Sequence, residues 1–500
     1  MLRHLGLIGR GADGRLVWLL LAGALLLYTV GFAAFYPSAV VNTDEDLYIE
    51  QTLVWLETGS LHASKQDPLT GATEVVVPGD YPMGMVVLFA PFVAGFGWRG
   101  AFIPAYLAVL VAVLATAKWL QEERRSPIFA LLLLGFPAVL VMGRMATSDT
   151  ARIATTALGL WLFFRGLDRE PRGWWLASGL VAGASLALRE NSVLPFIPFF
   201  AGSVLRWDRG WGWLLLGGLL GAAFHLTGNM LAFGDPLFVR GHQGFYPFEI
   251  EHLHERLLLY LLGLLVFVPG GLAFGLAYRG RRRPEVLTTI VGFFLFFLFQ
   301  AYGASESGFV KSLVLGLRYF DSLLPLLAFA MAESVPRWLG IERGAKSARM
   351  GALVRKGSVL WLAGVLVACF AVHPALDRWA GSQAQIRGAL EQHVPRETVL
   401  ITNYNALRKF VPDLNRPYRT LDRRELSSES LHALGLRHEV YFVALLDRSD
   451  SDYWRADMEA NAAFSTQLPA SAALILDLNA TQTDRLRIWR VGEPREATSR

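Results

Sequence analysis

Residues 16–48 read LVWLLLAGALLLYTVGFAAFYPSAVVNTDEDLY and contain the two features from which the architecture follows. The run from Leu16 to Tyr36 carries no charge, and about 20 such residues are enough for a helix to cross a bilayer core. Three acids, Asp44, Glu45 and Asp46, come soon after it. Carboxylates at a membrane boundary are costly beside lipid and suit proton abstraction or cation binding. We therefore expect a membrane-spanning helix that leads into an acidic segment.

The composition of the whole chain is that of an integral membrane protein. Of its 500 residues, 53% are hydrophobic and 18% are charged, and the mean hydropathy is +0.37. This is too apolar for a soluble chain of that length. The net charge of +5 does not indicate a nucleic-acid partner, because the basic residues gather between apolar runs. The single cysteine, Cys369, excludes an intrachain disulfide. No small-residue cleavage site precedes Asn42, so we expect the first span to be retained.

Eleven apolar segments are candidate membrane spans of a polytopic α-helical protein. They lie at residues 16–36, 101–120, 127–143, 150–166, 174–188, 192–205, 211–232, 256–278, 286–302, 319–338 and 358–373. The fifth and sixth are short, which is compatible with tilted or partial spans or with one broken hairpin.

The distribution of basic residues predicts the orientation of these spans. Alternate loops are rich in Arg and Lys, beginning with the N-terminal segment, whereas the loops between them are sparse. The sparse loops hold Arg144, Arg152, Arg189, Arg240, Arg256, Lys311 and Arg318. Because cytoplasmic loops carry the excess of Lys and Arg, the N-terminus is predicted to be cytoplasmic. Eleven spans then place the tail from His373 outside.

Residues 37–99 are predicted to form one long external loop. The apolar stretch 82–98 resembles a further span, but counting it would invert every later loop, so we interpret it as an interfacial helix. The segment 44–56 also reads as a helix, with Thr43 as N-cap, acids in the first turn and Gly59 after its end. The transmembrane domain is thus assigned to residues 1–375.

The last part of the chain, residues 376–500, has the pattern of a small α/β domain outside the membrane. Apolar runs at 398–401, 440–444 and 473–476 read as buried strands. The segments 404–411, 427–436 and 452–467 read as helices, and alternation of this kind is typical of α/β domains.

Several ionisable residues are predicted to lie on the external side and could converge on one cavity. Each also has a structural interpretation. Asp44, Glu45 and Asp46 could simply complement a helix dipole. Arg144 could be a membrane-interface anchor and Asp149 a helix-start residue. Arg318 and Tyr319 could likewise anchor a span at the interface. The functional alternative is a phosphate clamp, because guanidinium matches phosphate oxygens bidentately.

Asp44, Glu45 and Tyr48 resemble the first external loop of GT-C glycosyltransferases, in the aminoarabinose-lipid A transferase and protein O-mannosyltransferase branch. Further segments resemble this branch in the same order, namely Tyr81-Pro82-Met83-Gly84, Ala146-Thr147-Ser148-Asp149, Gly234-Asp235-Pro236-Leu237 and Arg318-Tyr319 with Pro325. The resemblance covers residues 1–375 and implies a bacterial inner-membrane enzyme with a periplasmic C-terminal domain.

The resemblance also implies an activity. GT-C enzymes of this branch take a sugar from a polyprenyl-phosphate carrier at the outer face and transfer it to a hydroxyl with inversion. The acceptor would be an envelope glycan, lipid or protein, and membrane lipids would surround the site. A positioned carboxylate must take the hydroxyl proton. Roles are assigned by the resemblance as follows: Asp44, Glu45 and Asp149 are catalytic; Arg144, Arg318 and Lys65 bind the donor phosphate; Asp46, Tyr48, Tyr81 and Tyr319 bind substrate.

A cofactor is not required by this scheme, although a divalent cation such as Mg²⁺ or Mn²⁺ could bind near the acids. One departure from the branch concerns the acceptor, because Asp80 and Tyr81 stand before Pro82 where the aminoarabinose transferases carry a basic residue. Two other classes stay open. A transporter or flippase of lipid-linked sugars would use the same charges, although no repeated halves are visible. An O-antigen ligase or polymerase would use a carrier diphosphate.

Overall fold

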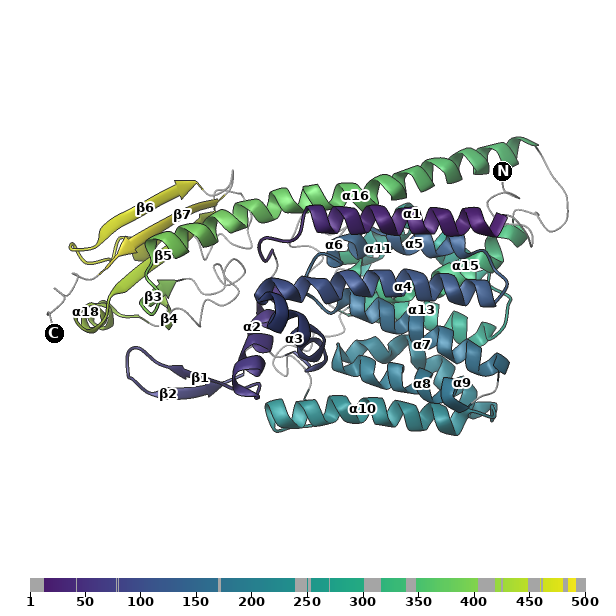
Figure 1. Ribbon diagram of the computed structural model, residues 1–500, viewed down its shortest axis with the longest axis horizontal. Helices are drawn as coiled ribbons and strands as arrows, with labels where there is room; N and C mark the ends of the chain where they lie inside the picture. Colours follow the sequence, from purple (N-terminus) through teal and green to yellow (C-terminus); the bar gives the residue numbers. More distant parts are fainter. Residues whose placement is uncertain are drawn as a thin grey trace. The chain divides into compact units, whose positions relative to one another are not determined.

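The computed structural model describes residues 13–41, 43–77, 79, 81–169, 172–238, 250, 253–268, 270–300, 316–338, 348–402, 419–423, 426–447, 459, 462–479 and 484–491. The chain divides into two compact units. The first unit comprises residues 1–36, 80–92 and 101–375, and the second comprises residues 37–79, 93–100 and 376–500. The elements of both are labelled in Figure 1.

The first unit is built from helices. They are α1 (Asp13–Ala34), α4 (Phe102–Glu122), η2 (Pro127–Ala130), α5 (Leu131–Leu134), α6 (Pro137–Met142), α7 (Asp149–Arg169), α8 (Arg172–Ala184), η3 (Ser185–Ala187), η4 (Glu190–Phe196), α9 (Ile197–Leu205), α10 (Trp211–Phe233), α11 (Leu253–Phe267), α12 (Gly271–Leu276), α13 (Arg283–Phe299), η5 (Gly316–Leu323) and α15 (Leu324–Trp338). Helices α3 (Gly84–Phe96) and α16 (Ala348–His393) contribute residues to both units. In Figure 1, α4, α7 and α8 run alongside one another.

Helices or broken helices occupy every segment that the sequence predicted as a span. Within the described residues, five of these segments are not continuous α-helices. The fifth ends as the 3₁₀ helix η3, and the sixth begins as the 3₁₀ helix η4. Residues 127–142 form three short pieces, because Pro137 lacks the N–H that would continue α5 and instead starts α6. The segment from Leu253 to Leu276 is broken at Gly270, whose φ is +70°. The segment ending at Trp338 begins as the 3₁₀ helix η5.

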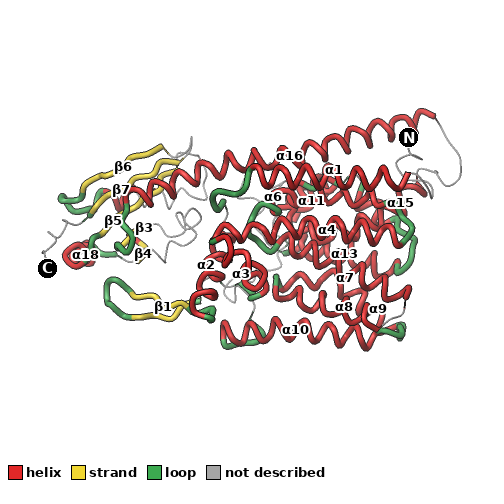
Figure 2. The backbone as a smooth tube through the Cα atoms, viewed as in Figure 1, coloured by secondary structure: helices red, strands yellow, loops and turns green. Residues whose placement is uncertain are grey.

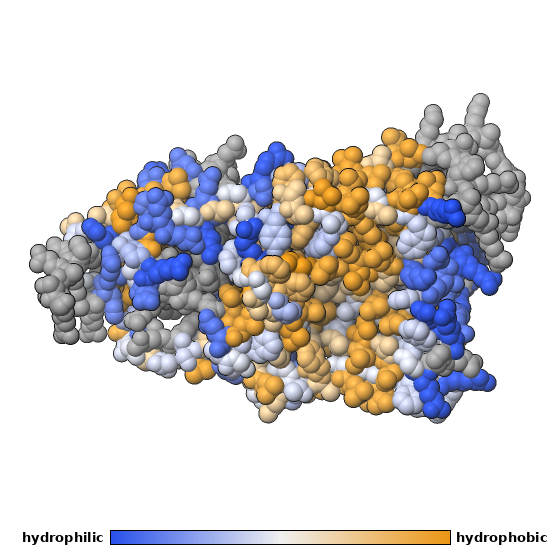
Figure 3. Space-filling view, in the orientation of Figure 1, coloured by the Kyte–Doolittle hydropathy of each residue, from blue (hydrophilic) through white to orange (hydrophobic). Residues whose placement is uncertain are grey.

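Four helices among the described residues are long and apolar enough to cross a membrane. They lie at Arg15–Ala34, Trp98–Glu122, Trp211–Phe233 and Val359–His393. Figure 3 shows hydrophobic residues spread over the sides of the first unit's helices and hydrophilic residues gathered at one set of helix ends. The chain is therefore a multi-pass helical membrane protein, while its total number of spans stays a prediction.

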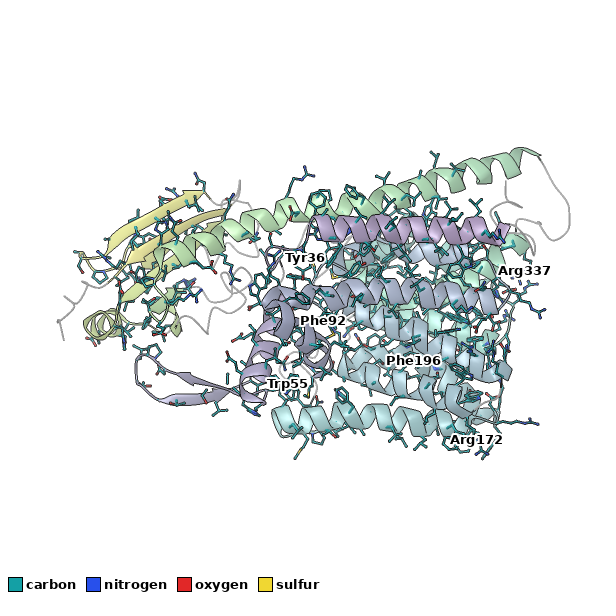
Figure 4. The ribbon with its side chains drawn as sticks, viewed as in Figure 1. Tyr36, Trp55, Phe92, Arg172, Phe196 and Arg337 are labelled. Carbon is teal, nitrogen blue, oxygen red and sulfur yellow. The ribbon has the colours of Figure 1, made fainter. Side chains whose placement is uncertain are left out.

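Residues of the predicted basic loops and residues next to or within the predicted first external loop lie at opposite ends of the first unit. Arg172 and Arg337 lie at one end of the first unit, and Tyr36 and Phe92 lie at the other (Figure 4). The helix predicted at 82–98 is present as α3, with 13 residues. At about 1.5 Å per residue it is too short to span a hydrocarbon core of about 30 Å.

Glycines set the distance between α8 and α10. A Cβ at Gly179 would lie 2.1 Å from the carbonyl oxygen of Leu214, and one at Gly183 would lie 2.1 Å from that of Gly218. On the facing side of α10, a Cβ at Gly217 would lie 2.1 Å from the carbonyl oxygen of Leu176, and one at Gly221 would lie 2.5 Å from that of Leu180. Small residues permit such backbone contact between membrane helices. The contact runs to the end of α8, after which the 3₁₀ helices η3 and η4 follow.

The second unit contains a short helix, a hairpin and a five-stranded sheet. Helix α2 (Thr43–Thr58) confirms the helix predicted at 44–56. Strands β1 (Ala63–Gln66) and β2 (Thr73–Val76) form an antiparallel hairpin. The sheet has the order β4-β3-β5-β7-β6 (Figure 2), with β3 parallel to β4 and β5, and β7 antiparallel to β5 and β6. Its strands are β3 (Val399–Thr402), β4 (Arg419–Asp422), β5 (Val440–Asp447), β6 (Ala473–Asn479) and β7 (Asp484–Arg490).

Apolar side chains cover both faces of this sheet. Ile386 and Leu390 of α16 pack on one face in a cluster with Leu400 and Val443. Helix α18 (Ser428–Arg437) packs on the other. The three predicted strands coincide with β3, β5 and β6, and the helix predicted at 427–436 coincides with α18. The prediction that the strand at 473–476 is buried was wrong, because β6 is an edge strand in which Leu474 is 50% and Ile475 37% exposed. The helix predicted at 404–411 and most of that at 452–467 lie outside the described residues.

Candidate active site

The start of α7 carries a buried carboxylate. The chain turns between Gly143 and Ser148, and α7 then begins at Asp149, whose side chain is only 1% exposed. The hydroxyl of Thr147 donates a hydrogen bond to the Asp149 carboxylate. An acid in the first turn also complements the helix dipole. The structural interpretation of Asp149 therefore holds, but it does not account for the other charges beside it.

Arg152 joins Asp149 to a second carboxylate. Its Nη2 lies 2.7 Å from Asp149 Oδ1 and 3.4 Å from Asp321 Oδ1, and all three side chains are at most 2% exposed. The other terminal nitrogen, Nη1, donates to Asn191 Oδ1 at 3.2 Å. One guanidinium thus holds segments from α7, η4 and η5 together.

Asp321 comes from η5 and is fully buried. The Ser322 hydroxyl donates to its Oδ1 at 3.1 Å. Its Oδ2 has no hydrogen-bond partner among the described residues, and neither has Nε of Arg152. Buried polar atoms are costly when they are unpaired. These atoms are therefore the ones that a bound water or substrate group would satisfy.

Two more guanidinium groups give this cluster a positive excess. Arg189 Nη1 lies 3.7 Å from Asp149 Oδ1, and Arg318 interacts electrostatically with Asp149. Arg318 is 8% exposed, and its Nη2 donates to Tyr319 Oη at 3.1 Å. Three arginines, Arg152, Arg189 and Arg318, face two aspartates, which gives the cluster a formal excess of one positive charge. Such an excess suits an anionic substrate.

The structure places Arg144 on the backbone of α16. Its Nη1 donates to the carbonyl oxygen of His373 at 2.8 Å and lies 3.4 Å from His373 Nδ1. The imidazole of His373 packs against Tyr28, with ring centroids 4.8 Å apart, and against Gly31, where a Cβ would lie 2.3 Å from His373 Cδ2. These contacts give Arg144 a structural function beside the one predicted for it.

The acidic segment lies in the second unit, at the start of α2. Its three acids are not equivalent. Glu45 and Asp46 are buried, and Glu45 Oε2 accepts a hydrogen bond from the backbone N–H of Val41 at 2.8 Å. Asp44 is only partly buried, and Tyr48 on the next turn is 1% exposed. Of the three carboxylates, that of Asp44 is the one most open to solvent.

The remaining predicted residues are Tyr81 and Lys65. Tyr81 is 1% exposed and lies three residues before α3 in the first unit. Lys65 lies in β1, paired with Glu74 of β2, and its side chain is outside the described part of the structure. The structure thus brings Asp149, Arg318 and Tyr319 together. Among the residues that it describes, no group of three or more His, Cys, Asp or Glu has a metal-binding arrangement.

No site role was predicted for Arg152, Arg189 or Asp321, although Arg152 and Arg189 were noted as charges of the sparse, external loops. A local signal existed for two of them. Arg152 follows Asp149 by three residues, which puts both on one helix face. Asp321 is an acid inside an apolar segment predicted to span the membrane, where ionisable groups are expensive and usually functional.

Three kinds of known protein are similar to this chain. The sequence profile of the family described as dolichyl-phosphate-mannose-protein mannosyltransferase matches residues 85–227. The lipopolysaccharide core galacturonosyltransferase RgtA of Rhizobium johnstonii is 27% identical over 175 residues. That match covers 32% of this chain and 35% of the relative, so it spans about a third of each protein.

The fold is that of ArnT from Cupriavidus metallidurans. The crystal structure of ArnT in the apo state matches 96% of this chain and 98% of its own, with a TM-score of 0.62 and 16% sequence identity. The structure of ArnT bound to undecaprenyl phosphate matches 96% of this chain and 98% of its own, with a TM-score of 0.61 and 16% identity. The family profile and the curated relative, which match only part of this chain, belong to a mannosyltransferase family and to a galacturonosyltransferase, and the fold of the whole chain is that of ArnT.

Proposed function

We propose that this chain transfers a sugar from a polyprenyl-phosphate carrier to a hydroxyl group of an envelope glycan, lipid or protein, with inversion at the anomeric carbon. The carrier class is supported by two of the similar proteins, since one family is described by dolichyl phosphate and ArnT is bound to undecaprenyl phosphate. The acceptor class is supported by RgtA, which is named as a transferase to the lipopolysaccharide core.

The observation that carries the proposal is the buried cluster of three arginines and two aspartates. When a sugar leaves its carrier, a phosphodiester with one negative charge becomes a phosphomonoester that approaches two. A site with a positive excess stabilises the second charge more than the first, and therefore favours the transition state over the bound donor. We assign this role first to Arg318 and Arg189, and after them to Arg144 and Lys65.

Asp44 is assigned as the base. In the proposed reaction the acceptor oxygen bonds to the anomeric carbon, its proton passes to the Asp44 carboxylate, and the carrier phosphate leaves with the electron pair. Its greater exposure favours Asp44 over the buried Glu45 and Asp46. Glu45, with its carboxylate on Val41, holds the start of α2. Tyr48, Tyr81 and Tyr319 are assigned to substrate binding, and Asp149 to orienting the acceptor or the arginines.

The test uses the purified full-length protein in vesicles that contain a radiolabelled polyprenyl-phosphate sugar and crude envelope acceptor. We expect labelled glycan and one equivalent of free carrier phosphate. Asp44→Asn should abolish both products, and Glu57→Gln, an exposed acid on the same helix, should leave both unchanged. Near-normal turnover by Asp44→Asn would remove Asp44 as the base.

The same assay separates the alternatives. A transporter or flippase would move the labelled lipid across the bilayer without releasing carrier phosphate. A ligase or polymerase would release carrier diphosphate from a diphosphate donor and would not use the monophosphate. Either result would contradict the proposed activity and would support the corresponding alternative.

We also propose the orientation, with the N-terminus cytoplasmic and the C-terminal part periplasmic in a bacterial inner membrane. The sole cysteine, Cys369, is buried, so a cysteine at Glu429, exposed in α18, gives a single reactive thiol. An impermeant maleimide should label Glu429→Cys in intact spheroplasts. Labelling only after lysis would overturn the orientation.

A further inference from the structure

The acid-bearing helix α2 is connected to the C-terminal part of the chain on its N-terminal side. Pro37 lies six residues before Thr43, where α2 begins, and its carbonyl oxygen accepts a hydrogen bond from Arg99 Nε at 3.0 Å. The neighbouring residue, Trp98, lies under the guanidinium of Arg387, whose Cζ is 4.7 Å from the centroid of the indole. Arg387 belongs to the last turns of α16. Pro37, Trp98, Arg99 and Arg387 all belong to the second unit.

The C-terminal side of α2 is connected to the same part of the chain. The helix ends at Thr58 and Gly59, where φ is +67°, and the β1–β2 hairpin follows. Leu69, at the tip of this hairpin, packs against the apolar cluster on one face of the five-stranded sheet, which includes Ile401 and Phe442. Both ends of the acid-bearing segment therefore meet the part of the chain from residue 376 onward.

The hairpin tip is built to present Leu69. The Asp67 carboxylate accepts hydrogen bonds from the backbone N–H groups of Leu69 at 2.9 Å and Thr70 at 3.3 Å, and from the Thr70 hydroxyl. Gly71 closes the turn with a φ of +75°. A turn held by its own side chains has few conformations, so the direction of Leu69 is fixed before it packs.

We infer that the C-terminal domain positions α2, and with it Asp44, through Leu69 and Arg387. This inference rests on the proposed function, since it concerns the placement of the proposed base. A base that is displaced by about 1 Å can cost about a hundredfold in rate. A 16-residue helix that is held at both ends keeps its first turn in place. Leu69 and Arg387 are positioning residues and do not touch the reacting atoms.

The alternative is a purely structural role, in which Leu69 only covers the apolar cluster of the sheet. That role affects folding and leaves the catalytic step of the folded protein unchanged. A positioning role predicts a lower kcat with little change in KM for the carrier-linked sugar, because carrier binding is assigned first to Arg318 and Arg189, which belong to the first unit.

The experiment compares Leu69→Ser and Arg387→Gln with matched controls in the vesicle assay. The first control, Val75→Ser, changes an exposed apolar residue of the same hairpin. The second, Glu391→Gln, removes the 2.9 Å ion pair with Arg387 but leaves Arg387 over Trp98. The third, Arg378→Ala, changes an exposed residue of α16. Both test variants should lose between about tenfold and a hundredfold in kcat, with KM changed less than about twofold. Leu69→Met should restore the rate, since it fills a similar volume.

Hydrogen exchange of residues 43–58 gives the second measurement. In both test variants we expect faster hydrogen exchange in α2. In the controls the exchange rate of α2 should be that of the wild type. Wild-type kcat in variants whose α2 exchange is raised would overturn the inference, and so would a loss of activity that follows only the amount of folded protein. If Leu69→Ser does not fold, Arg387→Gln decides alone. Wild-type protein without transfer activity would instead contradict the proposed function.

Discussion

Arg152 Nη2 lies 2.7 Å from Asp149 Oδ1, with both side chains at most 2% exposed. This buried pair carries a third member, because the same nitrogen lies 3.4 Å from Asp321 Oδ1. Charges removed from water are stable only when they are paired and hydrogen-bonded, and loss of one partner leaves the others uncompensated. The buried ion pair is therefore expected to matter both for the stability of the first unit and for the proposed binding of substrate.

Removing Arg152 should unfold the first unit more readily. Arg152→Ala leaves two carboxylates buried without their shared cation, and breaking a buried pair in this way typically costs about 3–5 kcal/mol. The unfolding midpoint in detergent, followed by tryptophan fluorescence, should fall clearly. Arg169→Ala, at the exposed end of the same helix, should leave the midpoint unchanged. Equal midpoints for both variants would show that the buried pair contributes nothing.

Arg318 and Arg189 should act on the donor and not on the acceptor. A hydrogen bond to a charged group contributes about 1.5–3 kcal/mol, and 1.4 kcal/mol is a factor of about ten. We therefore expect Arg318→Ala and Arg189→Ala each to lower kcat/KM for the carrier-linked sugar by about ten- to a hundredfold, with the larger part of the loss in kcat. The acceptor KM should stay constant, and inhibition by free carrier phosphate should weaken in parallel. An unchanged kcat/KM for the carrier-linked sugar in both variants would mean that the phosphate lies elsewhere.

Substitutions should distinguish the functions of the acids at the start of α2. Glu45→Gln keeps an oxygen that can accept the Val41 N–H, so we expect most of the activity to remain. Glu45→Ala loses that acceptor at the start of a helix, a change that typically costs about 1 kcal/mol. Asp44→Asn should fold normally and be inactive. Rates and melting curves of the three variants check this order, and an inactive, well-folded Glu45→Gln would give Glu45 a direct catalytic role.

The helices could be predicted because apolar runs of membrane length are a local property of the sequence. What could not be predicted is where a run breaks. The interruption at Gly270 and the 3₁₀ start of the last segment depend on packing against neighbouring helices. For the same reason, the sequence predicted the helix at 44–56 from its caps but assigned Glu45 to chemistry, although its buried oxygen is used by Val41.

The site was predictable only as far as chain neighbours determine it. Asp149 and Arg318 were recognised because they end apolar segments on one predicted side. The contact between Arg152 and Asp321 joins residues 169 positions apart, and no local sequence pattern predicts it. For Arg144, the position in the sequence predicted a phosphate ligand, whereas in the structure its Nη1 donates a hydrogen bond to the carbonyl oxygen of His373.

The α8–α10 contact should be intolerant of a single methyl group. Gly179→Ala would place a Cβ 2.1 Å from the Leu214 carbonyl, which is backbone and cannot rotate away. Overpacking of this kind costs about 1–3 kcal/mol. Gly173→Ala, in the same helix with no atom within 4 Å, should be neutral or stabilising, because alanine is the better helix former. A melting comparison decides, and equal stability of the two variants would show that the helices are not in this close contact.

The hairpin tip gives the prediction that depends on pH. The Thr70 hydroxyl donates to Asp67 and, with the backbone N–H groups of Leu69 and Thr70, lowers the pKa of that carboxyl below its ordinary value. A carboxyl whose pKa is lowered by folding stabilises the fold above its unfolded pKa of about 3.9. That contribution is lost as the pH falls through the lower, folded pKa.

The turn should therefore loosen only in acid, below about pH 4, and not between pH 5 and pH 8. A spin label beside Leu69 reports this directly, because its mobility should rise in that acid range as the tip leaves the apolar cluster. In Asp67→Asn the mobility should be raised slightly at all pH values and should no longer titrate, since asparagine keeps an acceptor but has no charge to lose. A wild-type transition near pH 6 would point to a histidine instead, and the Asp67 account of the turn would have to be given up.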